Sequence, residues 1–477
     1  MKIERLNLNR REVLKAAAAV GVTSSLGLSG CSDAEQEQQA PVLQGAIGKD
    51  GQRVPPWSNW SGNQVSEPNE RLVPRDTDEL STMIAKAKQG IRLVGAGHSF
   101  SPLVPTNESL MSLAYFNGIT HIDKAAKQFE VAANTFLASA GEPLWQEGLS
   151  LINMPDINTQ TFGGAIATST HGTGATLGSM STNVTGMSLV SGQGEVVHCS
   201  QDSNTELFQA ARNNIGALGA VTGMKIQVKD QYYLQETSWM MDLQEGLEQA
   251  EALRDKHRHF ELYALPHADY IMGITLDEVD EQALSQPQES SGDAYETFKT
   301  LSKVIDAVPF MKRFIINTGA STVTKEVRSG RNYEVFGNIR DIRFNEMEYS
   351  VPAEYGVKCL TEILDTIKKQ NINVIFPIEV RYIKGDDIWL SPFYQRDSCA
   401  ISCHNFHDKD YKEYFAAIEP IFLKYDGRPH WGKIHSLTAK EQSARYPMFD
   451  EFLKVRAAMD PRGLFANAHI KSVLGLS

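Results

Sequence analysis

The chain has 477 residues, 42% of them hydrophobic, and its 46 basic and 58 acidic side chains give a formal net charge of −12. That length and apolar content suffice for two or three domains, each with its own core. The acidic balance, and the absence of a basic patch interleaved with aromatic residues, argue against nucleic acid as a partner. The sequence shows no internal repeat and predicts a soluble, acidic, multidomain protein.

The first 30 residues resemble an export signal. The run Asn9-Arg-Arg-Glu-Val-Leu-Lys15 resembles the twin-arginine pattern, and the apolar stretch at 16–28 is too short to span a membrane as a mature helix. Leu28-Ser-Gly-Cys31 resembles a bacterial lipobox, although an amphipathic start with an incidental cysteine would look similar. We therefore expect a twin-arginine lipoprotein signal peptide at 1–30. Lipidation of Cys31 would anchor the protein to a membrane on the periplasmic side, and Ser32 favours the outer membrane in a Gram-negative host.

The next segment, residues 31–56, is polar and rich in Gln, Glu and Ala, without hydrophobic periodicity. This composition predicts a flexible tether with a root-mean-square reach of roughly 25 to 30 Å. The folded part of the chain should therefore begin near Trp57.

Two glycine-rich runs follow, each after a short apolar segment that is typical of a strand. The first, Val94-Gly-Ala-Gly-His-Ser-Phe100, comes after 91–94, and the second, Thr161 to Gly174, comes after 151–154. The first run is not a Rossmann fingerprint, because position 100 would have to be a third glycine that opens a helix. Two such runs instead predict backbone amides that converge on one phosphate-rich ligand.

The periodicity of apolar residues divides the folded part in two. Up to about residue 228 the pattern predicts short helices at 78–89, 144–148 and 204–211, with strands at 119–134 and 219–228. From residue 229 it predicts longer helices at 242–256 and 296–307, strands at 260–265, 342–350 and 374–382, and a last helix at 446–459. The expected fold class is therefore α+β, with one domain over 57–228 and a second over 229–477.

The strand expected at 374–382 carries a pair of charged residues. Glu379 and Arg381 lie two positions apart, so both face one side of the strand, while Val380 and its neighbours face the other. A solvated strand face with an ion pair would give the same pattern. The pair is therefore a hypothesis for an active site that needs further support.

The cysteines after the signal peptide give no metal pattern. Cys199, Cys359, Cys399 and Cys403 are scattered, and none has zinc-site spacing. The run from His404 to His407 lacks carboxylates at helical spacing. We expect no metal site, and buried free thiols are favoured over a disulfide.

Together these motifs resemble one family of flavoproteins. The two glycine-rich runs are similar to the FAD-binding loops of the vanillyl-alcohol-oxidase type. Five further motifs resemble its sugar-1,4-lactone oxidase branch, which includes gulonolactone and arabinonolactone oxidases: Asn345-Glu-Met-Glu-Tyr-Ser-Val-Pro352, Glu379-Val-Arg381, Trp389-Leu-Ser-Pro392, Arg396-Asp-Ser-Cys399 and Gly427-Arg-Pro-His-Trp-Gly-Lys433. The resemblance runs from about residue 57 to 476. It implies a two-part, PCMH-type FAD-binding domain over 57–228 and a substrate domain over 229–477 whose tail packs back on the first.

The resemblance also implies how FAD is held. His98, which alone would be interpreted as a capping or core residue, would carry a covalent bond to the flavin 8-methyl group. Twin-arginine export moves folded proteins, so flavin attached in the cytoplasm could cross in place. Most family members carry a small residue where this chain has Asp156. The implied cofactor contacts are Val94, Gly95, Ala96, Gly97, His98, Ser99, Asp156, Thr161, Gly164, Thr168, Ser169, Thr170, His171 and Val221.

The chemistry implied by the resemblance is hydride transfer from a sugar-1,4-lactone. Glu379 would hold or deprotonate the substrate hydroxyl, while Arg381 and Lys433 would stabilise its alkoxide-like oxygen. Ser402 and His404 would contact substrate, with Ser402 a departure from the asparagine or histidine of relatives.

Pro155 would lie at a gate beside the flavin, which favours oxygen as acceptor and hydrogen peroxide as product. The alternatives are an alditol oxidase and a dehydrogenase that feeds a periplasmic electron carrier. A lipoprotein that only binds a ligand is a third, and the presence of His98, Glu379, Arg381 and Lys433 argues against it.

Overall fold

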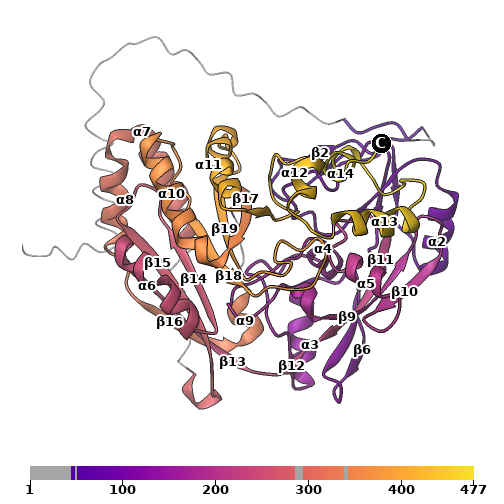
Figure 1. Ribbon diagram of the computed structural model, residues 1–477, viewed down its shortest axis with the longest axis horizontal. Helices are drawn as coiled ribbons and strands as arrows, with labels where there is room; N and C mark the ends of the chain where they lie inside the picture. The colour runs from indigo at the N-terminus through magenta and orange to yellow at the C-terminus, as the bar shows by residue number, and fades with distance from the viewer. Residues whose placement is uncertain (1–43, 49–50, 285–293, 338–341) are drawn as a thin grey trace, which may run out of the picture.

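The computed structural model describes residues 44–48, 51–284, 294–337 and 342–477, with the backbone alone for 294–299. The expected signal peptide and Cys31 lie outside these residues. Two halves lie side by side in Figure 1, with the first half in purple on one side and the orange strands and helices of the second half on the other. Within the described ranges no helix is both long and apolar enough to cross a membrane.

The first half contains a parallel sheet and a larger antiparallel one. The parallel sheet has the order β3 (Glu70–Leu72), β5 (Ser109–Ser112), β4 (Ile91–Val94). The antiparallel sheet has the order β10 (Val196–Ser200), β9 (Val184–Val190), β11 (Ala220–Gln227), β7 (Gln128–Ala132), β6 (Ile119–Asp123). Two short pairs are β1 (Trp57–Ser58) with β2 (Val65–Ser66) and β8 (Leu149–Ser150) with β12 (Lys229–Asp230).

Most elements predicted in this half are confirmed. The helices form as α2 (Thr77–Lys86), α3 (Gly141–Gln146) and α5 (Thr205–Ala211), and the last strand forms as β11. The segment 119–134 is a hairpin rather than one strand, because Lys127 adopts a left-handed φ of 51° between β6 and β7. The strand expected at 151–154 is wrong: the Asn153 side chain there bonds the Met154 N–H and the Thr173 carbonyl in place of a sheet partner.

The second half is built on one antiparallel sheet of eight strands. Their order is β16 (Glu326–Arg331), β13 (Tyr233–Asp242), β15 (Tyr270–Val279), β14 (His259–Ala264), β18 (Ile378–Ile383), β19 (Ser398–Phe406), β17 (Phe344–Pro352), β20 (Arg428–Pro429). The helices of this half are α6 (Leu243–Lys256), α7 (Ala294–Ala307), α8 (Lys312–Ala320), α9 (Asn332–Phe336), α10 (Gly356–Lys369) and α11 (Lys412–Lys424). The two long helices that the sequence predicted, α6 and α7, are confirmed. β18 begins four residues later than expected, because Pro377 has no N–H for a sheet bond.

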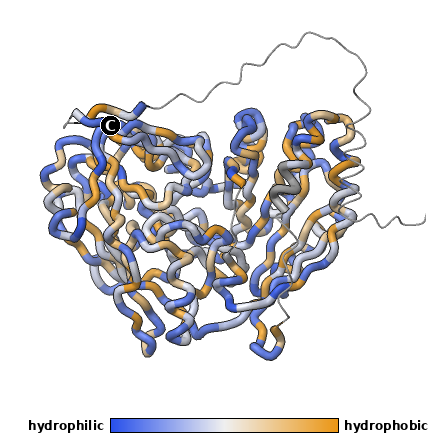
Figure 2. The backbone as a smooth tube through the Cα atoms, turned by 180° about the vertical axis from the view of Figure 1, so that it is seen from behind, coloured by the Kyte–Doolittle hydropathy of each residue, from blue (hydrophilic) through white to orange (hydrophobic). Residues whose placement is uncertain are grey.

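The alternation of side chains along β17, β18 and β19 determines which face of this sheet lies against the helices. One set of side chains, which includes Tyr349, Val380 and Ile401, packs in a core with Leu360 and Ile363 of α10. The other set is charged or polar and faces away from that core. Because a slip of one residue would push charges into the apolar core, the burial of these side chains fixes the register. Figure 2 shows the resulting mixture of hydrophobic and hydrophilic residues along the chain.

The C-terminal segment returns to the first half, where its yellow helices lie beside the purple elements in Figure 1. Phe452 and Ile470 share a core with Phe208 of α5. The helix predicted at 446–459 begins only at 449, and it is not the last one. The segment contains α12 (Ala439–Ser443), α13 (Phe449–Met459) and α14 (Ala468–Leu474).

The four cysteines at 199, 359, 399 and 403 are buried and free, which confirms the interpretation of them as thiols.

Candidate active site

A cavity lies between the two halves, and the empty space inside it is about 1720 Å³, including the part that is open to solvent. Its lining from the first half comes from residues 92–104, 155–171 and 214–221. The second half contributes residues of β14, β17, β18 and β19 and the loop at 430–433. Both glycine-rich runs therefore meet at one site, as their pairing in the sequence predicted.

The first glycine-rich run leaves β4 at Val94 and crosses the cavity wall as a loop. Gly97 has a φ of 71°, a left-handed conformation that glycine adopts without strain. A Cβ on Gly95 would lie 2.4 Å from the Thr161 Oγ1, so the two runs touch here without room for a side chain. The Phe100 N–H donates to the Gly432 carbonyl at 2.7 Å, which joins this loop to the second half.

The second run opens with a six-residue helix, α4 (Phe162–Ala167), whose first turn is capped by the Thr161 side chain. Behind it, the Gly163 N–H donates to the Ala133 carbonyl at 2.7 Å, and a Cβ on Gly163 would come within 3.0 Å of that oxygen. The backbone thus lies directly against β7, with no space between them. These contacts fix the position of the run at the cavity wall.

The donor set along this wall fits a long, phosphate-bearing cofactor such as FAD. Glycines at 95, 97, 163, 164, 216 and 219 line the cavity and leave backbone groups accessible to a ligand. Of the predicted contacts, Ser169 alone does not line it; its hydroxyl is buried, with no hydrogen-bond partner among the described residues. The others all do: Val94, Gly95, Ala96, Gly97, His98, Ser99, Asp156, Thr161, Gly164, Thr168, Thr170, His171 and Val221. Pro155 also lines the cavity, next to Asp156.

His98 projects into the cavity from the first run. Its Nε2 lies 2.9 Å from the Thr159 Oγ1, and its ring lies against Trp60 with centroids 5.4 Å apart. Burial, reinforced by the charge of Lys433, lowers the pKa of His98 to about 4. At neutral pH the imidazole is therefore uncharged, and one ring nitrogen keeps a lone pair.

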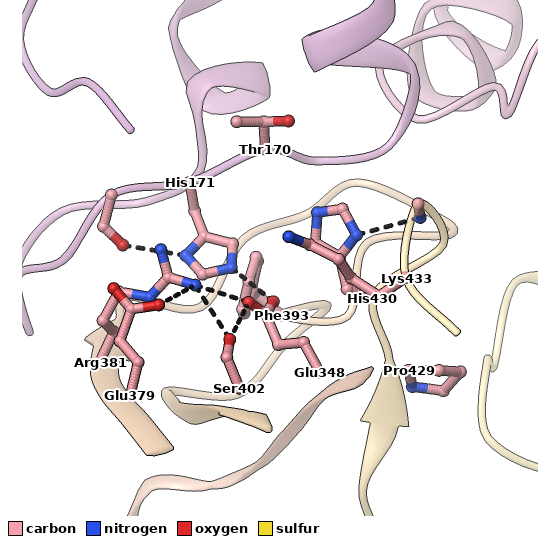
Figure 3. Close-up of polar contacts among 12 residues, drawn as sticks. Thr170, His171, Glu348, Glu379, Arg381, Phe393, Ser402, Pro429, His430 and Lys433 are labelled. Carbon is pink, nitrogen blue, oxygen red and sulfur yellow. Dashed lines mark hydrogen bonds and ion pairs between the residues drawn. The ribbon is translucent and has the colours of Figure 1, made fainter. Parts of the chain in front are cut away.

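On the opposite wall, β18 presents Glu379 and Arg381 side by side, as Figure 3 shows. The Arg381 guanidinium lies 3.4 Å from Glu379 and 2.6 Å from Glu348, and the Tyr263 hydroxyl donates to Glu379 at 2.8 Å. Both members of the predicted pair line the cavity. They belong to a buried network, which a solvated strand face would not form.

Two buried carboxylates in this network, Glu346 and Glu348, had no role assigned from sequence. Both project from β17 into the cavity. Burial alone would raise the pKa of the Glu348 carboxyl, but the charges of His171 and Arg381 outweigh burial and hold the pKa well below its usual range. Two glutamates alternating with apolar residues on a strand were the available signal, because a carboxylate on a buried strand requires a partner.

Lys433 reaches the same wall from the loop after β20. Its ammonium forms an ion pair with Glu346 and lies 5.0 Å from the centroid of the Phe100 ring. Burial would raise the pKa of Glu346, but the charges of Lys433 and His404 keep it below its usual value. The structure therefore places Glu379, Arg381 and Lys433 around one cavity.

The two residues predicted to contact substrate differ in position. His404 lines the cavity, stacked on Phe376 with centroids 5.1 Å apart. Ser402 does not line it, which corrects the prediction. Its hydroxyl is buried and donates to Glu348 at 2.6 Å, so the side chain lies behind the wall that Glu348 and Arg381 form.

Two groups of side chains in this wall lie close enough to hold a metal ion: His171, Glu348 and His430, and Glu346, Glu379 and His404. In each group the carboxylates already pair with Arg381 or Lys433. Organic cations therefore already balance these charges. We therefore still predict that this site binds no metal ion.

The fold and the cavity define a two-domain FAD-binding flavoprotein of the vanillyl-alcohol-oxidase type, and the family model "FAD binding domain" matches residues 68–200. The solved structure of cholesterol oxidase from Brevibacterium sterolicum has the same fold, with a TM-score of 0.73 at 16% identity over 88% of this chain and 96% of that one. The model "D-arabinono-1,4-lactone oxidase" matches residues 224–473, and the chain belongs to that family.

Curated relatives span nearly the whole chain. An L-gulono-1,4-lactone dehydrogenase of Mycobacterium tuberculosis is 34% identical over 88% of this chain and 99% of its own length. The L-gulonolactone oxidase of Bos taurus is 29% identical over 87% of this chain and 98% of its own. An alditol oxidase of Streptomyces is 25% identical over 87% of this chain and 98% of its own.

Proposed function

We propose that this protein is an FAD-dependent oxidoreductase that oxidises a sugar-1,4-lactone at a hydroxyl-bearing carbon. One observation carries the proposal: the buried network of Glu379, Arg381, Glu348, Glu346 and Lys433 faces the wall formed by both glycine-rich runs. FAD, when bound there, supplies the acceptor for a hydride. Family membership and the names of the relatives support the lactone as the substrate class.

The charged wall gives each residue a role in removing a hydride from an alcohol. Withdrawal of the hydroxyl proton places electron density on the oxygen, which forms the carbonyl as the hydride leaves the carbon, and Glu379 accepts that proton or holds it. Arg381 and Lys433 stabilise the alkoxide-like oxygen by their fixed positive charge. Their buried carboxylate partners hold both cations in place before substrate binds, so little reorganisation is needed during the reaction.

We also propose a covalent bond between His98 and the flavin and oxygen as the electron acceptor. The uncharged imidazole of His98 supports the bond, because a nucleophile needs a free lone pair. Acid-precipitated protein should keep flavin fluorescence in its own band on a denaturing gel, and His98→Ala should release it. Flavin that washes out of the wild type in acid would overturn the covalent bond alone.

A substrate screen with purified holoprotein tests the activity. Aldonolactones and alditols are offered in parallel, with hydrogen peroxide release and reduction of an artificial dye as separate readouts. We expect turnover of one or more 1,4-lactones with peroxide release. Turnover of alditols alone would favour the alditol oxidase alternative, and dye reduction without peroxide would favour a dehydrogenase.

For the N-terminus we propose twin-arginine export and anchoring through lipidated Cys31 on the periplasmic face of a membrane. Cell fractionation should recover the wild type with membranes, and Cys31→Ala should move it to the soluble fraction or leave it uncleaved. Arg10→Lys combined with Arg11→Lys should retain it in the cytoplasm. Wild type that is wholly soluble in the cytoplasm would contradict this proposal.

A further inference from the structure

His171, at the end of the second glycine-rich run, lies between two oxygen acceptors. Its Nε2 is 2.8 Å from the Glu348 Oε1, and its Nδ1 is 2.9 Å from the Gly172 carbonyl oxygen (Figure 3). A neutral imidazole has one N–H donor and one lone pair, so one of these buried oxygens would face a lone pair. Rotating the imidazole ring by 180° would place a ring carbon, rather than Nε2, against the Glu348 carboxylate, which would then lack its hydrogen-bond donor. Because the pKa of Glu348 lies well below its usual range, its carboxylate is ionised and can only accept, so only the doubly protonated imidazolium satisfies both contacts.

A second histidine close by is arranged in the opposite way. The His430 ring lies 6.0 Å from the His171 ring, and its Nδ1 accepts the N–H of Gly432 at 3.0 Å, so that nitrogen carries no proton. Burial lowers the pKa of His430 to about 3. Of these two neighbouring buried histidines, His171 is the one built to carry a charge.

The ion pairs around Glu348 support the same protonation state. Glu348 is shared by His171 at 2.8 Å and Arg381 at 2.6 Å, and Arg381 also pairs with Glu379 at 3.4 Å. With a neutral His171, one buried arginine would face two buried carboxylates, which is costly.

Glu261, opposite Arg381 in the sheet, does not add a third carboxylate charge beside Arg381. Burial and the charge of Glu379 raise the pKa of the Glu261 carboxyl to about 8, so it is mostly neutral at pH 7.

We propose that His171 is a cation at pH 7, held by Glu348, and that this charge raises the reduction potential of the flavin bound against the second glycine-rich run. The inference rests on the proposed function in that it assumes flavin in this cavity. A fixed positive charge beside the cofactor stabilises the reduced form, which gains negative charge, more than the oxidised form. Glu348 therefore serves both walls, since one of its oxygens holds His171 and the other holds Arg381.

The midpoint potential of the bound flavin, measured anaerobically against a reference dye, tests this without any substrate. His171→Gln should lower the equilibrium constant for flavin reduction about tenfold, which is about 30 mV for a two-electron couple. Glu348→Gln removes one negative charge, and His171 then loses its proton and its positive charge. The net charge stays the same, so the potential should move little. Adding His171→Gln to this variant should cause no further change. A neutral His171 gives the reverse result: no shift in His171→Gln and a rise in Glu348→Gln. That outcome would overturn the proposal.

A matched control and a direct measurement complete the test. His259 is buried and its Nδ1–H donates to the Thr173 carbonyl at 2.8 Å, yet it does not line the cavity, so His259→Gln should leave the potential unchanged. Nitrogen-15 NMR of histidine-labelled wild-type holoprotein at pH 7 should show one buried imidazolium that disappears in His171→Gln. A neutral signal at that position would refute the inference even if Glu348→Gln does not fold. Protein that binds no flavin would instead refute the proposed function.

Discussion

The two walls of the cavity come from the two halves of the chain. Backbone groups form most of one wall, and side chains form the other. The wall from the first half is largely backbone, exposed at glycines such as Gly95 and Gly163, and it depends on the absence of side chains. The wall from the second half consists of charged side chains, such as Arg381 and Lys433, that depend on their partners. A substitution in the first wall adds atoms where there is no room. A substitution in the second leaves a buried charge without its partner, which costs more.

Arg381→Met should have the largest effect, because it leaves Glu379 without its cation and removes one of the two cations that hold Glu348. Breaking a buried ion pair costs about 3 to 5 kcal/mol, so the free energy of unfolding should fall by about that much, and flavin reduction should slow roughly 100-fold or more. Denaturant titration and anaerobic stopped-flow reduction measure the two effects. The control is Arg331→Met, which removes an ion pair with Glu142 at the surface and should change the free energy of unfolding little, because solvent screens such a pair. Equal losses in both variants would contradict the cost assigned to breaking the buried ion pairs of this wall.

A charge that only faced a pocket would contribute little to stability. The contacts of Arg381 with two buried carboxylates are the reason to expect a large loss.

Lys433→Met leaves buried Glu346 without its lysine, so it should lower stability as well as slow the chemistry, but less than Arg381→Met because Lys433 has one carboxylate partner. The alkoxide-like oxygen would lose one preorganised cation, and flavin reduction should slow by roughly 100-fold. Stopped-flow reduction by the best lactone gives the rate, and flavin content should stay near that of the wild type. Lys384→Met, which breaks an exposed pair with Asp397, should reduce flavin at the normal rate. A normal rate in Lys433→Met as well would assign Lys433 a structural role only.

Gly95→Ala tests the backbone wall. The added Cβ would lie 2.4 Å from the Thr161 Oγ1, and overpacking of this kind costs about 1 to 3 kcal/mol, so bound FAD should fall without any change of charge. The flavin-to-protein absorbance ratio measures the loss, and Thr161→Ala in the same chain should restore part of it. In Gly319→Ala, where the Cβ meets nothing within 4 Å, FAD content should not change. A full complement of FAD in Gly95→Ala would show that this wall tolerates side chains.

Local patterns along the chain could be predicted from the sequence, whereas contacts between distant segments could not. The alternation of Glu379, Val380 and Arg381 gave the charged face correctly, because a strand has a strict period of two. The partners of those charges could not be derived, because Glu348 and His171 are 177 positions apart and meet only when the halves close on each other. The hairpin at 119–134 was missed because one residue, Lys127, adopts a left-handed conformation without being glycine.

Ser402→Ala should have the smallest effect, because this side chain lies behind the charged wall. The substitution removes the hydrogen bond of 2.6 Å to Glu348, and a bond to a charged group contributes about 1.5 to 3 kcal/mol, so stability should fall by less than in Arg381→Met. Glu348 keeps its contacts with His171 and Arg381, so the KM for the lactone should stay near that of the wild type while kcat falls modestly. His404→Ala, at the cavity surface, should instead raise KM. Steady-state kinetics separates substrate contact from support of Glu348. A KM that rises in Ser402→Ala and stays constant in His404→Ala would show that Ser402 contacts the substrate, contrary to its position behind the wall.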